Sequence, residues 1–421
     1  MHSATARFPA LAAAAAAAAL LLAVGAAGSA AASPARPGVE SGAAPAIASR
    51  PAPADAGTVK VQISIGDFNG TFRAMAKLKL VTKAGRGLVG VILPDTLSSD
   101  RFGRFDAPYL KRAFATAGLP ASQLKVASAH GADATQLAEA QADITLGAKA
   151  LILDPLDSGV GGAIESIAAA HGVPVIDYDQ FTLGGSRRYY VSFNVVAVGR
   201  TLGRGLVSCV SAWGVKKPQV IIMNGGSVGS TATRLAAGYD QVLSPYFKSG
   251  KWALVSEPAG TWDPPTAAAE FRQQYAKHPG LNSALIPDDE NAAPIISFLQ
   301  GQRIKARTFP ITGQDATLTG LRNILGGYQC GTAYKPDYLE AQGAAALALF
   351  LRAGLKPPAS LLNAQFKDPS GKKASVPSML FGPVWVTTKN LKSTVVADKY
   401  VSVSQLCKGY ATACKAAGIT G

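Results

Sequence analysis

Residues 309–336, with the sequence FPITGQDATLTGLRNILGGYQCGTAYKP, contain the unit from which the fold is built. The apolar run at 309–312 predicts a strand that ends in Gly-Gln-Asp, and a helical segment follows as far as Leu325. Gly-Gly ends this helix, and a second predicted strand ends at Lys335. In an open parallel sheet, ligands bind outside the carboxyl ends of the strands. Asp315 and Lys335 are therefore candidate ligand-binding residues.

The same order of strand, polar turn and helix extends along the chain on both sides of this stretch. Apolar runs at 88–93 (LVGVIL), 150–153 (ALIL) and 219–223 (QVIIM) each end in a polar turn, and helical segments follow. Strands that alternate with helices indicate βαβ units and a parallel sheet. About nine such strands in two series suit two doubly wound domains better than one sheet. We therefore predict an α/β fold with two Rossmann-like, parallel-sheet lobes.

The first 32 residues resemble an export signal. Arg7 precedes an apolar run at 10–24, and the small residues 30–32 form an A-x-A site. An uncleaved membrane anchor is the alternative, but the run is shorter than the ~20 residues of a spanning helix. No cysteine lies near this segment, which argues against a lipid-anchored export route. We expect an exported protein, located in the periplasm or at the outer face of the cell envelope.

A linker follows the predicted signal peptide. Residues 33–57 consist mainly of Ala, Pro, Gly and Ser, a composition that cannot form a hydrophobic core. No element is predicted for 58–84. We therefore assign 33–84 to a linker and N-terminal extension.

The formal net charge of +15 belongs almost entirely to the residues after the linker. A basic exported protein can contact an anionic envelope surface, and binding of nucleic acid is the other interpretation. The basic residues are scattered along the sequence, with neither a basic helix nor an aromatic RNA-binding platform. We interpret the charge as a solvated basic surface and expect no nucleic-acid partner.

The four cysteines of the chain are Cys209, Cys330, Cys407 and Cys414. An even number in an exported chain predicts two disulfides, with three possible pairings. Bridging Cys407 and Cys414 requires a turn between them, because seven residues of continuous helix span ~10 Å. No cysteine has a second cysteine or a histidine at the spacing of a zinc site. We expect neither a metal nor a cofactor.

Polar and aromatic side chains gather where the predicted strands end. The strand ends carry Asp179, Gln180, Asn194, Asp289, Asp315 and Lys335, and nearby loops carry Arg101, Phe102 and Trp262. Carboxylates accept from vicinal hydroxyls, cations donate, and aromatic rings cover the C–H face of a sugar. An Asp after a strand can instead cap the next helix. Phosphate-loop, dinucleotide and G-x-S-x-G motifs are absent from the sequence, and no acid–base pair indicates catalysis.

Six segments, in this order, resemble a known family of proteins. They are LPDTLSSDRF (93–102), VPVIDYDQ (173–180), YYVSFN (189–194), GTWDPPTA (260–267), ITGQDA (311–316) and TAYKP (332–336). The set is similar to the periplasmic sugar-binding proteins of bacterial ABC importers, and most similar to the D-xylose-binding type. This resemblance extends from about Gly85 to Ser402, which is nearly all of the chain that is predicted to fold.

The resemblance implies a type I periplasmic binding protein fold, in which two lobes joined by a three-segment hinge close on a monosaccharide. The implied N-terminal lobe comprises 85–193 and about 336–378. The implied C-terminal lobe comprises 194–335 and about 379–402, and 403–421 form a tail with two cysteines. The first crossing is placed near Asn194 and the second near Lys335.

The resemblance also implies which residues contact the sugar. These positions are Arg101, Phe102, Asp179, Asn194, Trp262, Asp289, Asp315 and Lys335, with Gln180 beside them. Phe102 stands where the xylose binders have Trp. Gln180 replaces an Arg, and Asn194-Val195 replaces Asp-Asn. Each lost charged hydrogen bond costs ~1.5–3 kcal/mol, so we expect a different sugar preference.

Our first hypothesis is therefore a monomeric, non-enzymatic solute-binding protein that captures a sugar and delivers it to a membrane ABC permease. A second hypothesis is a sensing module, whose closed form docks on a membrane sensor or chemoreceptor. A third is a secreted glycoside hydrolase, which requires two carboxyl groups ~5–10 Å apart across a glycosidic bond.

Overall fold

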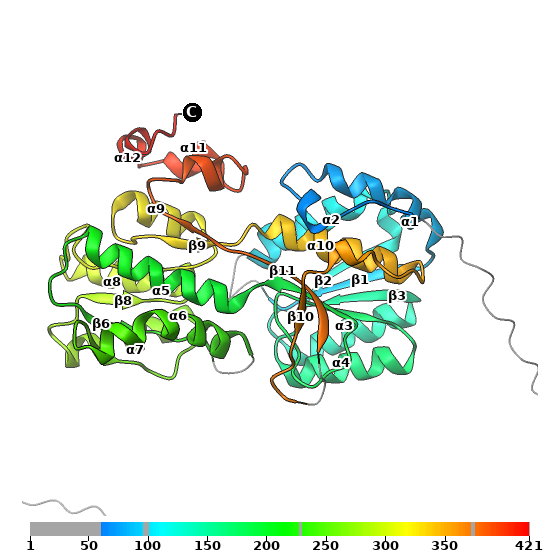
Figure 1. Ribbon diagram of the computed structural model, residues 1–421, viewed down its shortest axis with the longest axis horizontal. Helices are drawn as coiled ribbons and strands as arrows, with labels where there is room; N and C mark the ends of the chain where they lie inside the picture. Colours follow the sequence, from blue (N-terminus) through cyan, green and yellow to red (C-terminus); the bar gives the residue numbers. More distant parts are fainter. Residues whose placement is uncertain (1–59, 96–100, 227–229, 372–374, 421) are drawn as a thin grey trace, which may run out of the picture. The chain divides into compact units, whose positions relative to one another are not determined.

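The computed structural model describes residues 60–95, 101–226, 230–371 and 375–420 (Figure 1). The predicted signal peptide and the linker as far as residue 59 lie outside the described residues. Parallel sheets covered by helices confirm the predicted α/β class. We define the N-terminal lobe by a seven-stranded sheet, and the C-terminal lobe by a three-stranded and a two-stranded sheet.

The sheet of the N-terminal lobe has the order β10-β11-β5-β4-β3-β1-β2. Its strands are β1 (Leu88–Leu93), β2 (Leu124–Ser128), β3 (Ala148–Leu153), β4 (Val175–Tyr178), β5 (Tyr189–Phe193), β10 (Ala364–Phe366) and β11 (Val376–Phe381). All neighbouring strands are parallel except β10 and β11. Apart from the edge strands β2 and β10, the strands are largely buried, as expected for a sheet with helices on both faces.

Helices cover both faces of this sheet (Figure 1). They are α1 (Lys79–Ala84), α2 (Ala107–Thr116) and α10 (Asp337–Arg352) on one face, and α3 (Asp133–Thr145) and α4 (Ser158–Ala170) on the other. Side chains alternate along β1, so Val89 and Val91 belong to the core that contains α2 and α10. Ile92 belongs to the core that contains α3 and α4.

Residues 60–84, which the sequence analysis left in the extension, are part of the N-terminal lobe. They form η1 (Ile65–Asp67), η2 (Arg73–Leu78) and α1, and Phe72, Met75 and Leu78 are buried in the core shared with α2 and α10. The sequence gives only a weak signal here, because two short helical segments of different pitch replace one periodic helix. Phe72 also occupies the N-cap with a left-handed φ of 63°, so no capping residue marks the start.

The C-terminal lobe continues the parallel arrangement. Its strands are β6 (Gln219–Ile222), β7 (Ala253–Ser256) and β8 (Ser283–Leu285), in the order β7-β6-β8, and the antiparallel pair β9 (Thr332–Tyr334) and β12 (Val384–Val386). The strand predicted at 309–312 is an extended segment that makes single parallel bridges, Ile311 to Ala284 and Gln314 to Ala333. This segment therefore lies between β8 and β9.

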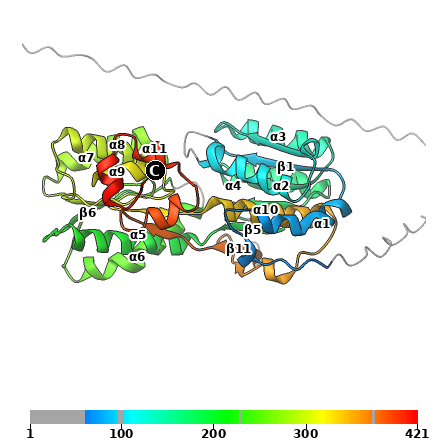
Figure 2. The ribbon, with the colours of Figure 1, turned by 90° about the horizontal axis from the view of Figure 1, so that it is seen from above.

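Helices also cover both faces of the sheet in this lobe (Figure 2). They are α5 (Val195–Ala212) and α6 (Ser230–Lys248) on one face, and α7 (Pro264–Lys277) and α8 (Asp289–Gly301) on the other. Within the part of the chain that the structure describes, α5 alone is long and apolar enough to cross a membrane. Half of it is buried, and Leu202 and Leu206 lie in the core with α6, so we interpret α5 as a core helix.

The chain passes between the lobes three times. The first passage lies at Asn194, between β5 and α5, and the second at Pro336, between β9 and α10. The third lies at 382–383, between β11 and β12. Residues 379–381, which the predicted boundaries put in the C-terminal lobe, therefore belong to the N-terminal sheet.

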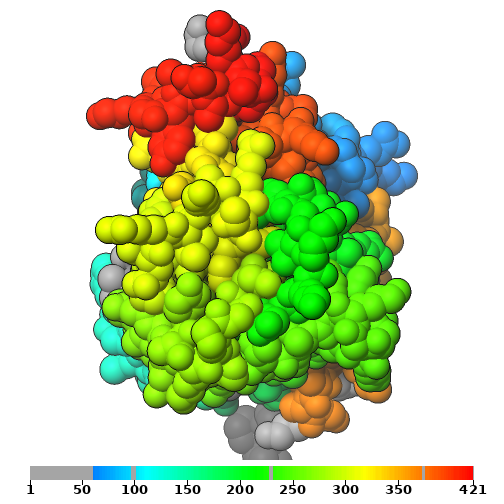
Figure 3. Space-filling view, turned by 90° about the vertical axis from the view of Figure 1, so that its left-hand side faces the viewer, coloured from blue at the N-terminus to red at the C-terminus, as the bar shows by residue number. Residues whose placement is uncertain are grey.

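The last part of the chain packs on the C-terminal lobe. Its helices α11 (Val403–Cys407) and α12 (Ala411–Ala416) lie against α9 (Leu318–Gly326). The other short elements of the described chain are the π-helices η3 (Phe102–Asp106) and η6 (Lys392–Val396) and the 3-10 helices η4 (Ala121–Gln123) and η5 (Ala359–Leu361). Leu406 and Ile419 share a core with Leu321 of α9, and Figure 3 shows this C-terminal segment in red over the yellow surface. Residues 403–420 are thus a packed element.

The structure contains two disulfides, as predicted, and selects one of the three pairings. Cys407 bonds to Cys414 across the turn between α11 and α12. Cys209 of α5 bonds to Cys330, two residues before β9. Each bond therefore ties together elements of the C-terminal lobe.

Replacing Leu78 tests whether residues 60–84 belong to the folded core. Leu78 is fully buried, whereas Leu80, two residues later, is 62% exposed. We expect Leu78→Ala to lower the free energy of unfolding in urea by ~2–5 kcal/mol. Leu80→Ala, the matched control, should change it by less than ~0.5 kcal/mol. Equal effects of the two substitutions would contradict the packing described above.

Candidate ligand-binding site

A cavity of about 80 Å³ lies where side chains from both lobes meet. Its lining residues are Arg101, Phe102, Asp179, Gln180, Thr231, Trp262, Asp288, Gln314, Asp315 and Lys335. The first four come from the N-terminal lobe, and Lys335 comes from the end of β9 at the second passage. The cavity thus adjoins the carboxyl ends of strands, where a parallel sheet leaves room for ligands.

Seven of the nine residues singled out in the sequence line this cavity. They are Arg101, Phe102, Asp179, Gln180, Trp262, Asp315 and Lys335. Asn194 instead caps α5, where its Oδ1 accepts from the backbone N–H of Ala197. Asp289 is fully buried and accepts from Gln329 Nε2 at 2.6 Å and from the Thr317 N–H at 2.8 Å. These two residues form hydrogen bonds within the C-terminal lobe and do not line the cavity.

Three residues of the lining were not predicted from the sequence: Thr231, Asp288 and Gln314. Asp288 is the N-cap of α8, and its Oδ1 accepts from the N–H of Asn291 at 2.6 Å. Asp289 begins the helix and turns away from the cavity into the protein, so the Asp-Asp pair divides between two roles. The pair was visible in the sequence, but which carboxylate faces the ligand depends on where the helix starts.

Lys335 connects carboxylates of both lobes. Its Nζ lies 3.1 Å from Asp315 Oδ1 and 3.7 Å from Asp179 Oδ1. Burial lowers the pKa of Lys335, but the two carboxylates outweigh this effect and raise it above its usual value. Burial raises the pKa of Asp179, but the nearby charges of Arg101 and Lys335 outweigh this effect. The pKa of Asp179 therefore lies below its usual value. The charged forms of Lys335 and Asp179 are therefore favoured.

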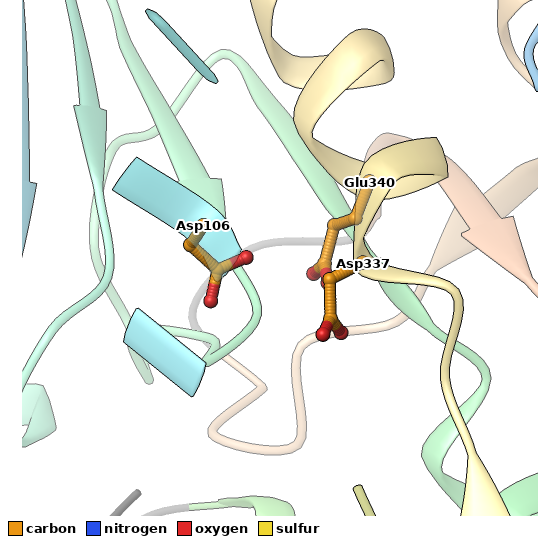
Figure 4. Close-up of side chains that lie close together, drawn as sticks. All are labelled: Asp106, Asp337 and Glu340. Atoms are coloured by element: carbon orange, nitrogen blue, oxygen red, sulfur yellow. The ribbon is translucent and has the colours of Figure 1, made fainter. Parts of the chain in front are cut away.

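Arg101 is the centre of a buried ion cluster. Its side chain is 2% exposed, and it donates to Asp106, Asp179 and Glu340 at 2.8–2.9 Å. Asp337 lies 3.7 Å from the same guanidinium. Figure 4 shows Asp106 of η3 facing Asp337 and Glu340, which both belong to α10. Burial raises the pKa of all three carboxyl groups, which reduces the negative charge around the single guanidinium. We therefore assign the three to positioning Arg101 rather than to a metal ion.

Tyr400, three residues before α11, contacts Asp315 and Asp337. Its hydroxyl lies 2.9 Å from the carbonyl oxygen of Asp315 and 3.1 Å from Asp337 Oδ2, and Phe105 stacks on its ring. A hydroxyl has one proton, so both contacts are favourable when Asp337 carries a proton and donates to Tyr400. Burial raises the pKa of Asp337 to about 8, in agreement with this arrangement.

Two aromatic side chains, Phe102 and Trp262, complete the lining. Trp262 lies against Gly225 and Gly226, where a Cβ atom would collide with the indole ring. The two glycines after β6 therefore leave the space that the indole occupies. The cavity combines aromatic faces with hydrogen-bonding groups of both kinds, which suits a small polar ligand.

The model of the periplasmic binding protein domain matches residues 89–356 of this chain. The chain belongs to the periplasmic binding protein family. Members of this family bind substrates and are not enzymes, in line with the non-enzymatic prediction.

Several relatives of this binding protein carry names that specify sugars. The D-xylose-binding periplasmic protein of Escherichia coli is 31% identical over 284 residues, which are 67% of this chain and 82% of that protein. The multiple sugar-binding periplasmic receptor ChvE of Rhizobium radiobacter is 29% identical and covers 64% of this chain and 80% of that protein.

Solved structures confirm the type I binding-protein fold. A carbohydrate transporter solute-binding protein from Chloroflexus aurantiacus, in complex with D-glucose, superimposes with a TM-score of 0.67 at 23% identity. The match covers 76% of this chain and 98% of the other. The Caulobacter myo-inositol binding protein gives a TM-score of 0.58 at 20% identity and covers 73% and 97% of the two chains.

The raised pKa of Asp337 predicts a dependence of stability on pH. Between the unfolded pKa of ~4 and the folded value near 8, the folded state holds a proton that the unfolded chain has lost. The free energy of unfolding should therefore fall as pH rises from 5 to 8, by up to ~1.4 kcal/mol per pH unit from this group. In urea titrations Asp337→Asn, whose amide also donates, should reduce this slope, so that the difference in free energy of unfolding between the variant and the wild type shifts in favour of the variant as pH rises from 5 to 8.

The exposed Asp133→Asn provides the control for this measurement. Other buried carboxyl groups add to the slope, so the comparison concerns the difference between each variant and the wild type. An Asp337→Asn slope equal to that of the wild type would show that Asp337 is ionised in the folded protein.

Proposed function

We propose that this protein is exported, captures a neutral sugar or related polyol in the cavity between its two lobes, and presents it to a membrane ABC permease. The observation that carries the proposal is the cavity itself. Polar groups from both lobes and the rings of Phe102 and Trp262 surround the same small space. A ligand that contacts both walls stabilises the closed form by the difference of its affinities for the closed and open forms.

The balance of charges in the lining favours a neutral ligand. Lys335 already pairs with Asp179 and Asp315, and Arg101 with its carboxylates. A charged ligand would add a buried charge without a partner, which costs several kcal/mol. Hydroxyl groups can instead accept from the cations and donate to the carboxylates at once, so that no charge is left unpaired.

The departures from the xylose-binding pattern differ in their position. Gln180 lines the cavity, whereas Asn194 caps α5 and Val195 is buried in the core. Of these three residues, Gln180 is therefore the one placed to change which hydroxyl groups are recognised. A neutral amide in place of a guanidinium supports a polyol other than D-xylose as the preferred ligand.

Delivery to a permease and a monomeric state belong to the proposal, as does a periplasmic or outer-face location. The relatives are periplasmic proteins, which supports that location. Sensing remains the second candidate function, because one relative is named a receptor. A glycoside hydrolase is set aside, since the family consists of substrate-binding proteins.

Calorimetric titration tests the proposal. We expect the chain starting at Ser33 to bind one member of a panel of pentoses, hexoses, inositols and polyols with a micromolar Kd or tighter. Asp315→Asn removes a charged acceptor from the lining and should weaken that binding by ~10–100-fold. Asp133→Asn, at an exposed position far along the sequence from the lining, is the control and should bind like the wild type.

Urea unfolding of each variant separates loss of the site from loss of the fold. A folded wild-type protein that binds no member of the panel would refute the proposed ligand class. Binding that survives in Asp315→Asn would place the ligand elsewhere on the protein.

A further inference from the structure

The net positive charge of the protein is concentrated in one part of the sequence. Residues 60–126 contain 11 Lys and Arg against 4 Asp and Glu, a net of +7 out of +15 for the whole chain. About half of the excess charge therefore lies in the first elements of the N-terminal lobe. In the sequence these residues are scattered, and η2 and α1 carry no clear helical pattern that would place them together.

The fold brings these basic side chains onto one face. Exposed Arg73, Lys77, Lys79, Lys83 and Arg86 come from η2, α1 and the turn that follows, and exposed Lys111 and Arg112 come from α2. We call these seven residues and Leu80 the basic face. The elements are adjacent, since the Arg112 guanidinium lies 4.3 Å from the centre of the Phe72 ring and Nη2 donates to the Thr71 carbonyl.

Acidic groups are scarce on this face. Among the described residues 60–95 and 101–126, the carboxylates are Asp67, Asp95 and Asp106, and the last two are buried. Asp67 pairs with Lys77 at 2.9 Å. From outside these elements, the half-buried Asp398 lines the same surface hollow as Arg73, Lys77 and Arg112, together with exposed Lys399. The remaining basic groups of the face, Lys79, Lys83, Arg86 and Lys111, have no exposed carboxylate within these elements to balance them. Such a surface attracts an extended layer of negative charge.

Leu80 adds an apolar group to the basic face. It is one of four large apolar side chains that are exposed among the described residues, and it is 62% exposed. Lys77 and Lys83 lie three residues to either side, so the three side chains share one side of the helical segment. The opposite side of the segment, with Met75, Leu78 and Val81, is committed to the core. Because these residues stay in the core, only the exposed side chains of the basic face can contact another surface.

We propose that the basic face adsorbs to a lipid bilayer that carries anionic headgroups, with Leu80 entering the interfacial layer. Several Lys and Arg around one exposed leucine match a planar anionic surface with an apolar interior. Each Lys or Arg near such a surface strengthens binding severalfold, and salt screens the attraction. This activity is separate from ligand capture, because none of the eight residues lines the ligand cavity.

The test is cosedimentation of the protein with vesicles. The chain starting at Ser33 keeps every described element, and residues 33–59 carry no net charge. It should bind vesicles of phosphatidylglycerol and phosphatidylcholine in 50 mM salt. Binding should be at least about tenfold weaker to pure phosphatidylcholine or in 500 mM salt.

Two matched triple variants assign the binding to this face. Lys79→Gln/Leu80→Ser/Lys83→Gln should lower the partition coefficient on anionic vesicles by at least about tenfold. Lys216→Gln/Lys217→Gln/Leu254→Ser removes the same charge and an exposed leucine from the C-terminal lobe, and should bind like the wild type.

An equal loss in both variants, no loss in either, or no vesicle binding by the wild-type chain would overturn the proposal. Calorimetry with the sugar panel on the same samples keeps the two proposals apart. Vesicle binding without sugar binding contradicts only the proposed transport function, and the reverse result contradicts only adsorption.

Discussion

The structure of the site depends on one buried cation, the guanidinium of Arg101. It donates to carboxylates from η3, from the loop after β4 and from α10, which lie far apart in the sequence. Breaking a buried ion pair leaves its partner charged and unsolvated, at a cost of ~3–5 kcal/mol. The three elements are therefore fixed to one another, and Asp179 is held in the lining of the cavity in its charged form.

Lys335 extends this network from one lobe to the other. It follows β9 at the second passage and lies between Asp179 of the N-terminal lobe and Asp315 of the C-terminal lobe. Burial raises the pKa of Asp288, which favours its neutral form, so the two cations Arg101 and Lys335 face the two carboxylates Asp179 and Asp315 in the lining. This balance favours a ligand that exchanges hydrogen bonds over one that brings charge. Burial raises the pKa of Asp337 to about 8, so this carboxyl group can keep its proton at neutral pH and donate a hydrogen bond within the network.

Residues 387–420, which follow β12, have a structural role in the site although they lie far from the lining residues in the sequence. The hydroxyl of Tyr400 forms hydrogen bonds with Asp315 and Asp337, and the ring of Tyr400 stacks on Phe105 of the N-terminal lobe. The same segment is packed on α9 and closed by the disulfide between Cys407 and Cys414. Tyr400 and the residues that it contacts, Phe105, Asp315 and Asp337, are thus far apart in the sequence, as are the residues that line the cavity.

The sequence alone determined the fold class, the strand ends and most of the lining, because apolar runs and helical patterns are local and the polar residues directly follow the strands. Asp315, Lys335 and Asp179 could be found in this way. Tertiary structure decided between Asp288 and Asp289, since one residue of helix register turns a carboxylate from the cavity into the core. It also decided the role of Tyr400, the disulfide pairing and the gathering of the basic face. Each of these depends on contacts between distant segments, which local patterns do not encode.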